Sequence, residues 1–133
     1  MNWMRVLLAG VVSGIVATIA NFVMHGVIMA GAYTKHQAFA VEEQANPLHF
    51  LLIAVCAGIM VAILFAKTQS CWAPGIAGGA TFGLFVGLAY FFMTFYYPLV
   101  IAGFPYHMGW CWAGIDLIQF VVYGAVIGAL YKK

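Results

Sequence analysis

Four polar side chains that could do acid–base or binding chemistry stand inside long apolar runs of this sequence. Asn21 and His25 are four residues apart, and Asp116 and Gln119 are three residues apart. At these spacings the two members of each pair share one face of a helix. Asp116 lies roughly 12 Å beyond the start of its predicted helix, at about 1.5 Å per residue. By depth, Asn21, His25, Asp116 and Gln119 are predicted to form one polar cluster.

Three kinds of chemistry are open to this cluster. In the first, Asn21, His25 and Asp116 hydrogen-bond to one another and only hold helices together, at roughly 0.6–2 kcal/mol per contact. In the second, Asp116 and His25 form a relay for protons or a solute, because an ionisable group in hydrocarbon is costly and marks transport paths. In the third, imidazoles bind a metal ion or haem iron.

The histidines form a scattered set of metal-ligand candidates. These candidates, His25, His49 and His107, stand on three different predicted helices, and no histidine pair has the spacing that places two imidazoles on one helix face. The sequence therefore requires no metal or cofactor, although haem or a metal ion stays open. It also has no G-x-S-x-G, H-E-x-x-H or phosphate-loop motif. We therefore expect a protein that is not an enzyme.

The composition places these residues in a membrane. The chain has 133 residues, of which 66% are hydrophobic and 6% charged, whereas a soluble domain is about 45–50% apolar and about 25% charged. So few charges cannot cover a water-facing surface, which excludes a soluble enzyme, a disordered chain and a free nucleic-acid binder. The net charge of +2 is too small for a polyanionic partner. The predicted partner is the lipid bilayer.

Four apolar runs are long enough to cross a bilayer, which takes roughly 20 residues. Pro47 opens the second run, and Pro98 and Pro105 separate the third run from the fourth. The predicted helices cover about residues 6–29, 47–66, 74–96 and 108–131. The fold prediction is therefore all-α: a single-domain transmembrane four-helix bundle with antiparallel, up-down connectivity.

Basic residues predict the orientation of the bundle. With four spans, four of the five basic residues fall on one side: Arg5, Lys67, Lys132 and Lys133. Lys35 falls on the other side, beside Glu42 and Glu43. The positive-inside rule then places both termini in the cytoplasm. Tyr33 and Trp112 belong to the aromatic belt expected at the outer interface, since headgroup depth favours Tyr and Trp.

Small residues at four-residue spacing predict how the helices meet. Lipid tails are as apolar as leucine, so membrane helices associate where small residues let their backbones approach. The third predicted helix carries the longest series: Gly75, Gly79, Gly83 and Gly87. The other helices carry shorter sets: Gly10 and Gly14, Gly58, and Gly124 and Gly128. The groove along the third helix could receive a helix of the same chain or a partner subunit.

The same glycines indicate a possible internal repeat. Shifted by 69 residues, Gly10 falls on Gly79, and shifted by 70 residues, Gly58 falls on Gly128. Apolar sequences match one another easily, so coincidence stays open beside a real repeat. A real repeat would be a 2+2 parallel one, with a pseudo-twofold axis along the membrane normal.

Two stretches of the chain resemble a family of small four-span bacterial inner-membrane proteins that has no assigned activity. The first is residues 21–26 (Asn-Phe-Val-Met-His-Gly) followed by Tyr33, and the second is residues 117–120 and 124–131. The resemblance covers the whole chain. It implies a bacterial inner membrane and brings no known reaction.

The glycine groove, the aromatic rim, the short loops and the missing catalytic constellation predict a protein that acts through helix contacts. The leading hypothesis is an accessory or structural subunit of a larger membrane complex, held by other membrane subunits or by copies of itself. One alternative is a small transporter or channel component that uses Asp116, His25 and Asn21. Another is a haem- or metal-binding protein that uses His25, His49 and His107.

Overall fold

The computed structural model describes residues 1–36 and 46–131, so Glu42, Glu43, Lys132 and Lys133 lie outside the described residues. In the described ranges every regular element is a helix, and the all-α prediction is confirmed. Four stretches are long and apolar enough to cross a membrane: Trp3–Ile28, Pro47–Cys71, Gly75–Val100 and Tyr106–Leu130.

The first span changes its helix type part-way along. It consists of α1 (Trp3–Asn21) and the π-helix η1 (Phe22–Ile28), and the short α2 (Ala30–Tyr33) follows it outside the span. The second span is α3 (Pro47–Thr68), which ends in the 3-10 turn η3 (Gln69–Cys71). The third is α4 (Gly75–Thr94) with the short α5 (Tyr97–Val100), and the fourth is α6 (Tyr106–Leu130).

Two spans begin with a side-chain cap. The Asn2 side chain accepts a hydrogen bond from Arg5 N at 3.2 Å, and the Asn46 side chain accepts one from Leu48 N at 2.9 Å. Pro47 stands at the first position of α3, where its missing N–H costs nothing. These caps satisfy amide groups that no helical partner reaches.

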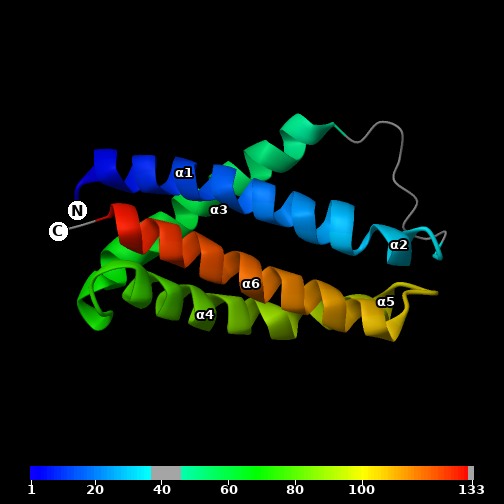
Figure 1. Ribbon diagram of the computed structural model, residues 1–133. Coiled ribbons are helices and arrows are strands. Elements are labelled where there is room, and N and C mark those ends of the chain that lie inside the picture. The colour runs from blue at the N-terminus through cyan, green and yellow to red at the C-terminus, as the bar shows by residue number, and fades with distance from the viewer. Residues whose placement is uncertain (37–45, 132–133) are drawn as a thin grey trace.

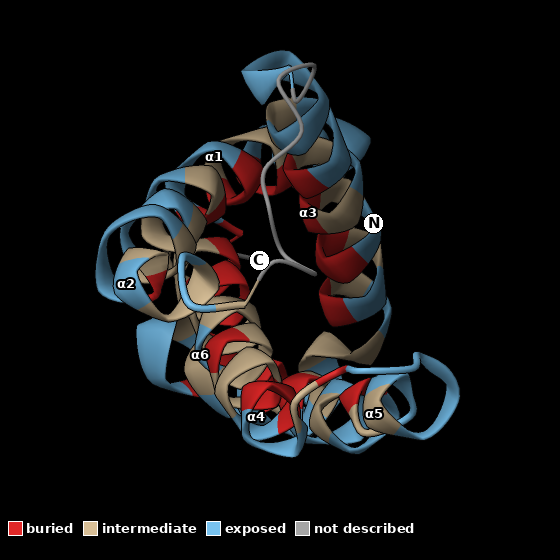
Figure 2. Ribbon diagram, turned by 90° about the vertical axis from the view of Figure 1, so that its right-hand side faces the viewer, coloured by how far each residue is buried: buried red, intermediate tan, exposed pale blue. Residues whose placement is uncertain are grey.

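The four long helices lie round an arc, in the order α3, α1, α6 and α4 (Figure 2). α6 packs on both α4 and α1, and α1 packs on α3. Neighbouring helices run antiparallel, so the up-down bundle is confirmed (Figure 1). We call the end where α1 begins and α6 ends the terminal end, and the end near α2 and α5 the loop end (Figure 1).

Glycines bring the helix pairs into backbone contact. A Cβ on Gly79 would lie 2.8 Å from Gly128 Cα, so α4 and α6 touch along their backbones. In the other pair, a Cβ on Gly10 would lie 2.6 Å from Ile59 Cα of α3. The remaining glycines with backbone neighbours at these two interfaces are Gly14, Gly58, Gly83, Gly87 and Gly124. The groove on α4 is therefore filled by α6 of the same chain.

Gly75 differs from the rest of its series. A Cβ on this residue would meet open space, and its φ of 79° is a left-handed conformation that glycine adopts without strain. It directly follows Pro74 and turns the chain into α4. Its carbonyl still lies against Gly128. The turn, and not the groove, is what requires glycine at this position.

The α1–α3 pair and the α4–α6 pair use the same kind of glycine contact. The register of this contact differs by one helical turn from the register that the apparent internal repeat predicts. Gly58 of α3 lies against Gly10 and Gly14 of α1. In the other pair, Gly124 takes the corresponding place on α4. The sequence match pairs Gly58 with Gly128 instead, so the second helix of the pair is displaced by one turn.

Two apolar clusters hold the bundle, one towards each end. The terminal cluster includes Val6, Val61, Phe65, Phe82, Tyr123 and Ile127. The loop cluster contains Met29, Phe104, Met108 and Ile115, with Tyr33 and Trp112 packed against it. Along α1–η1 and along α6, the polar residues singled out above fall between these two clusters.

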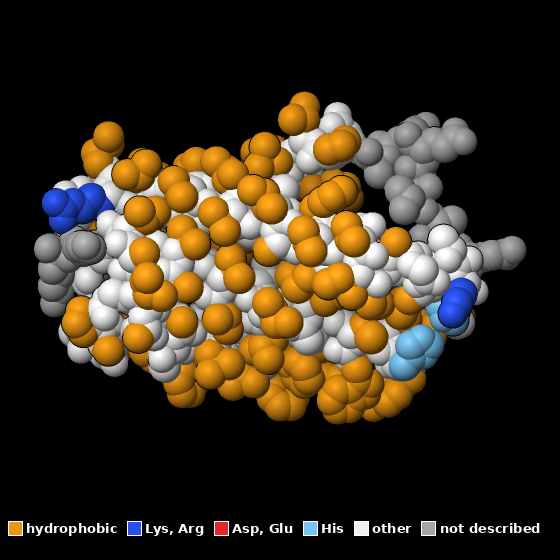
Figure 3. All heavy atoms as spheres, viewed as in Figure 1, with side chains coloured by type: hydrophobic (Ala, Val, Ile, Leu, Met, Phe, Trp, Pro, Cys, Tyr) orange, Lys and Arg blue, Asp and Glu red, His pale blue; other side chains and the backbone are white. Residues whose placement is uncertain are grey.

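The sides of the bundle are apolar as well. Figure 3 shows hydrophobic side chains over the whole length of the visible face, with Lys and Arg side chains only at the two ends. Exposed side chains such as Leu52 (61%) and Phe92 (70%) would face hydrocarbon in a bilayer. This distribution is that of a small multi-pass membrane protein.

The glycine contacts predict the effect of a single methyl group. Gly79→Ala should lower the free energy of unfolding by about 1–3 kcal/mol, because the methyl group forces α4 away from the α6 backbone. Gly114→Ala in α6 is the matched control, because its methyl group would meet open space. Unfolding in mixed micelles, followed by circular dichroism, measures both. Equal stability of the two variants would contradict the backbone contact.

Candidate functional site

A cavity of about 370 Å³, which we call the central cavity, lies between the two apolar clusters. All four spans contribute to its wall, and it is lined by all four residues of the predicted cluster: Asn21, His25, Asp116 and Gln119. The rest of the wall is apolar or aromatic: Phe50, Ile53, Ala54, Ala57, Tyr90, Phe120 and Tyr123. Its volume is within the range of about 300–1,000 Å³ that is typical of small-molecule sites.

On one wall, His25 is fixed by two aromatic residues of the loop end. The Trp112 indole donates a hydrogen bond to the Tyr33 hydroxyl at 2.9 Å, and that hydroxyl also bonds to His25 Nδ1. The His25 and Tyr33 rings stack, with centroids 6.0 Å apart. The loop cluster packs against Tyr33 and Trp112 and thereby holds this chain of hydrogen bonds in place.

The direction of these bonds determines which nitrogen of His25 carries the proton. An indole N–H can only donate, so the Tyr33 oxygen is the acceptor for Trp112. Burial raises the pKa of the Tyr33 phenol, and the Trp112 hydrogen bond opposes this only in part. The hydroxyl therefore keeps its proton. Because a phenol O–H is a stronger donor than the N–H of a neutral imidazole, we assign this bond as the Tyr33 hydroxyl donating to His25 Nδ1. Neutral His25 then has its own proton on Nε2.

On α6, Asp116 has a single hydrogen-bonding neighbour among the described residues. Thr94 Oγ1, buried in α4, lies 3.3 Å from Asp116 Oδ2 and 3.2 Å from the Tyr90 carbonyl oxygen. A hydroxyl has one proton, so Thr94 cannot satisfy both acceptors at once. Among the described residues, no basic side chain forms an ion pair with Asp116. Most of the carboxyl group's hydrogen-bonding capacity is therefore left to the cavity.

The two amides of the cavity are also unbonded. Within residues 1–36 and 46–131, the side chains of Asn21 and Gln119 make no hydrogen bond, and none of their polar atoms is fully buried. By contrast, the Tyr123 hydroxyl donates to the Ala54 carbonyl at 2.9 Å and ties α6 to α3. The free polar groups of the cavity are thus a carboxyl group and two amides.

Among the described residues, the structure does not contain the hydrogen bonds of the first of the three interpretations, in which the polar residues of the cluster bond to one another. Asn21, His25 and Asp116 line one cavity but do not hydrogen-bond to one another, because His25 bonds to Tyr33 and Asp116 to Thr94. The sequence analysis placed Tyr33 only in the interfacial belt and did not single out Thr94. The sequence spacing of Tyr33 and Thr94 does not indicate either bond, because both bonds depend on how segments distant in the sequence pack.

The π-helix η1 is a second feature that the sequence analysis missed. It begins at Phe22, and the bond from Met29 N to Met24 O, 3.0 Å long, reaches back five residues. The wider turn changes the direction of side chains beyond Asn21, so simple helical spacing does not describe His25. Gly26, a weak helix former, is the one signal of irregularity in this run. Such π turns are frequent at functional sites.

The candidate metal ligands are not gathered into a metal site. In the described part of the chain, no three His, Cys, Asp or Glu side chains converge on one point. His49 is exposed in the first turn of α3, and the His107 ring lies 5.5 Å from the ring of His36. His25 is bonded to Tyr33 instead.

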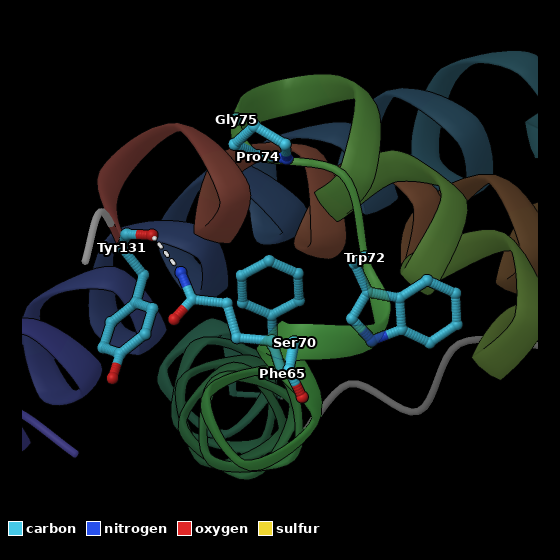
Figure 4. A pocket seen from close by; sticks show the side chains of 7 residues that line it. Phe65, Ser70, Trp72, Pro74, Gly75 and Tyr131 are labelled. Atoms are coloured by element: carbon cyan, nitrogen blue, oxygen red, sulfur yellow. Dashed lines mark hydrogen bonds between the residues drawn. The ribbon is translucent and has the colours of Figure 1, made fainter.

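A larger cavity, of about 560 Å³, lies at the terminal end. The Gln69 amide nitrogen donates to the Tyr131 carbonyl oxygen, 3.5 Å away. Figure 4 shows Tyr131 in this cavity together with the rings of Phe65 and Trp72. Among residues 1–36 and 46–131, no Lys, Arg, Asp or Glu side chain lines this cavity. The central cavity is therefore the stronger candidate site, because it alone of the two contains an ionisable group inside a span.

Comparison with protein-family models, curated proteins and solved structures finds no match to this chain. The resemblance to small four-span bacterial proteins therefore stays a prediction. What the cavity can do rests on its own geometry: a carboxyl group, two amides and a neutral imidazole surround a space lined by aromatic rings.

The hydrogen bonds of Tyr33 predict the tautomer of His25. With His36, His49 and His107 replaced by Gln, nitrogen NMR of the remaining imidazole should show the proton on Nε2. Tyr33→Phe should shift the population towards the other tautomer, because the donor to Nδ1 is lost. Tyr96→Phe, at an exposed tyrosine, is the control. An unchanged tautomer in Tyr33→Phe would contradict the bonding scheme.

Proposed function

We propose that the protein binds a small molecule within the membrane, in the central cavity, and acts as a transporter or as a component of one. One observation carries this proposal: Asp116, the one acidic residue in the described part of the chain, faces a cavity built by all four spans. A carboxyl group at this depth is costly, and intramembrane ionisable groups commonly belong to solute or proton pathways. Cavities between the helices of a bundle are common ligand sites.

The structure gives the accessory-subunit hypothesis less support than the sequence does. Its main motive is the glycine groove, and α6 of the same chain fills that groove. A role in a larger complex or a homo-oligomer stays a prediction that no contact described here addresses. A ligand-binding cavity gives a specific reason for the polar residues, which helix contacts alone do not.

The proposal includes a location. We place the protein in a bacterial inner membrane with both termini in the cytoplasm. Arg5 and Lys67 belong to spans that bring them to the terminal end, whereas Lys35 lies beyond α2 at the loop end. The positive-inside rule favours this orientation.

Filling the cavity should abolish binding of an apolar probe. The probe is neutral N-phenyl-1-naphthylamine, and the reporter is Trp112, whose ring lies 6.4 Å from that of His25. With Trp3, Trp72 and Trp110 replaced by Phe, energy transfer from Trp112 to the probe in nanodiscs should be saturable. Ala57→Phe should remove the saturable component, because Ala57 lines the cavity.

Ala89→Phe is the control for this experiment, because Ala89 is exposed on α4 and does not line the cavity. It should bind the probe as the parent does. If transfer in the parent rises only linearly with probe, as simple partition into lipid requires, the proposed function is wrong. Equal binding by Ala57→Phe and the parent would contradict the location of the site.

A further inference from the structure

The charges of the central cavity are one-sided. Among the residues that the structure describes, Asp116 is the only acidic residue of its wall, and no Lys or Arg lines it. His25 adds no positive charge when the Tyr33 hydroxyl donates to its Nδ1. An anion would therefore meet a carboxyl group without a compensating charge, whereas a cation would meet one that has only Thr94 as a partner.

The rings around Asp116 also favour a cation. Tyr90, Phe120 and Phe50 line the same cavity, and the rings of Tyr90 and Phe120 lie 5.3 Å apart. Aromatic faces attract ammonium groups, most strongly where water is excluded. The amides of Asn21 and Gln119 add acceptor oxygens to which no group in residues 1–36 or 46–131 donates. Together these groups can replace the water shell of one ammonium group.

A second cavity, of about 400 Å³, adjoins the first between η1 and α3. The two share four lining residues: Asn21, His25, Phe50 and Ala54. The second cavity is almost wholly apolar and extends to Phe22, which is 68% exposed on the first span, and to Pro47, the exposed first residue of α3. It therefore joins the polar cavity to the surface that would face the lipid chains.

We propose that the protein binds an amphiphilic monocation, with its ammonium group beside Asp116 and its apolar tail in the cavity between η1 and α3. This inference rests on the proposed function and names the class of molecule that the same site takes. The ligand reaches the site sideways from the bilayer, because the apolar cavity opens between two spans. The ammonium end of a zwitterionic lipid headgroup, although that lipid is not a monocation, presents the same cationic group to Asp116 as a free amphiphilic amine does.

The test compares three probes that share a decyl chain and differ in the charge of the headgroup: decyltrimethylammonium, decanol and decyl sulfate. Each is titrated against bound N-phenyl-1-naphthylamine in phosphatidylglycerol nanodiscs, with Trp112 as the reporter. The parent should bind the cation roughly ten-fold or more tightly than decanol, and decyl sulfate least tightly. Asp116→Asn should lose most of the preference for the cation, measured as the ratio of the affinities of this variant for decyltrimethylammonium and decanol.

Gln119→Glu provides a second variant if Asp116→Asn does not fold. It adds a carboxyl group to the same wall and should increase the preference for the cation above that of the parent. Decyl sulfate binding should weaken further in this variant. An unchanged preference in Gln119→Glu would overturn the inference.

The outcomes separate this inference from the proposed function. Two results would show that the monocation inference is wrong while the cavity remains a binding site for naphthylamine. In the first, the parent shows no preference for the cation over decanol. In the second, Asp116→Asn keeps the preference that the parent shows. If the probe does not bind at all, both proposals fail. Nanodiscs containing phosphatidylethanolamine distinguish the two sources: competition with decyltrimethylammonium indicates a lipid headgroup, and no competition indicates a free amine.

Discussion

A carboxyl group inside a bilayer must be matched by a proton, a cation or a set of hydrogen-bond donors. Asp116 has one shared hydroxyl, that of Thr94, and no basic partner among the described residues. The bundle nevertheless keeps this group at the wall of a cavity that all four spans line. The cost of such a group in hydrocarbon is high enough that its retention in a purely structural role would need explanation.

Glycine contacts determine where that cavity can exist. They draw α4 against α6 and α1 against α3 along their backbones, so each pair is closely packed. α3 and α4 lie at opposite ends of the arc (Figure 2). The space between the two pairs is lined by side chains from all four spans. The terminal cluster packs all four spans together on one side of this space, and the loop cluster packs the first span against the fourth on the other side. Close backbone contact within each helix pair and a cavity between the pairs thus both follow from where the glycines lie.

The fold could be predicted from the sequence because it depends on local composition. Charge-free runs, prolines and glycine spacing indicate four antiparallel spans, and depth alone brings Asn21, His25, Asp116 and Gln119 to one level. The bonding partners could not be predicted in this way. Tyr33 and Thr94 reach His25 and Asp116 only after the helices pack, and the π turn at Phe22 changes the direction of the His25 side chain. The one-turn displacement of Gly58 relative to the apparent repeat has the same origin, since register depends on contacts between helices.

The central claim is that Asp116 faces a cavity that is open to the bilayer and holds a cation. Reaction with the apolar reagent dicyclohexylcarbodiimide in nanodiscs, mapped by peptide mass spectrometry, tests it most directly. The account predicts that Asp116 is modified, that a water-soluble carbodiimide does not modify it, and that decyltrimethylammonium protects it while decanol does not. An Asp116 that resists the apolar reagent, or that decyltrimethylammonium does not protect, would contradict the account.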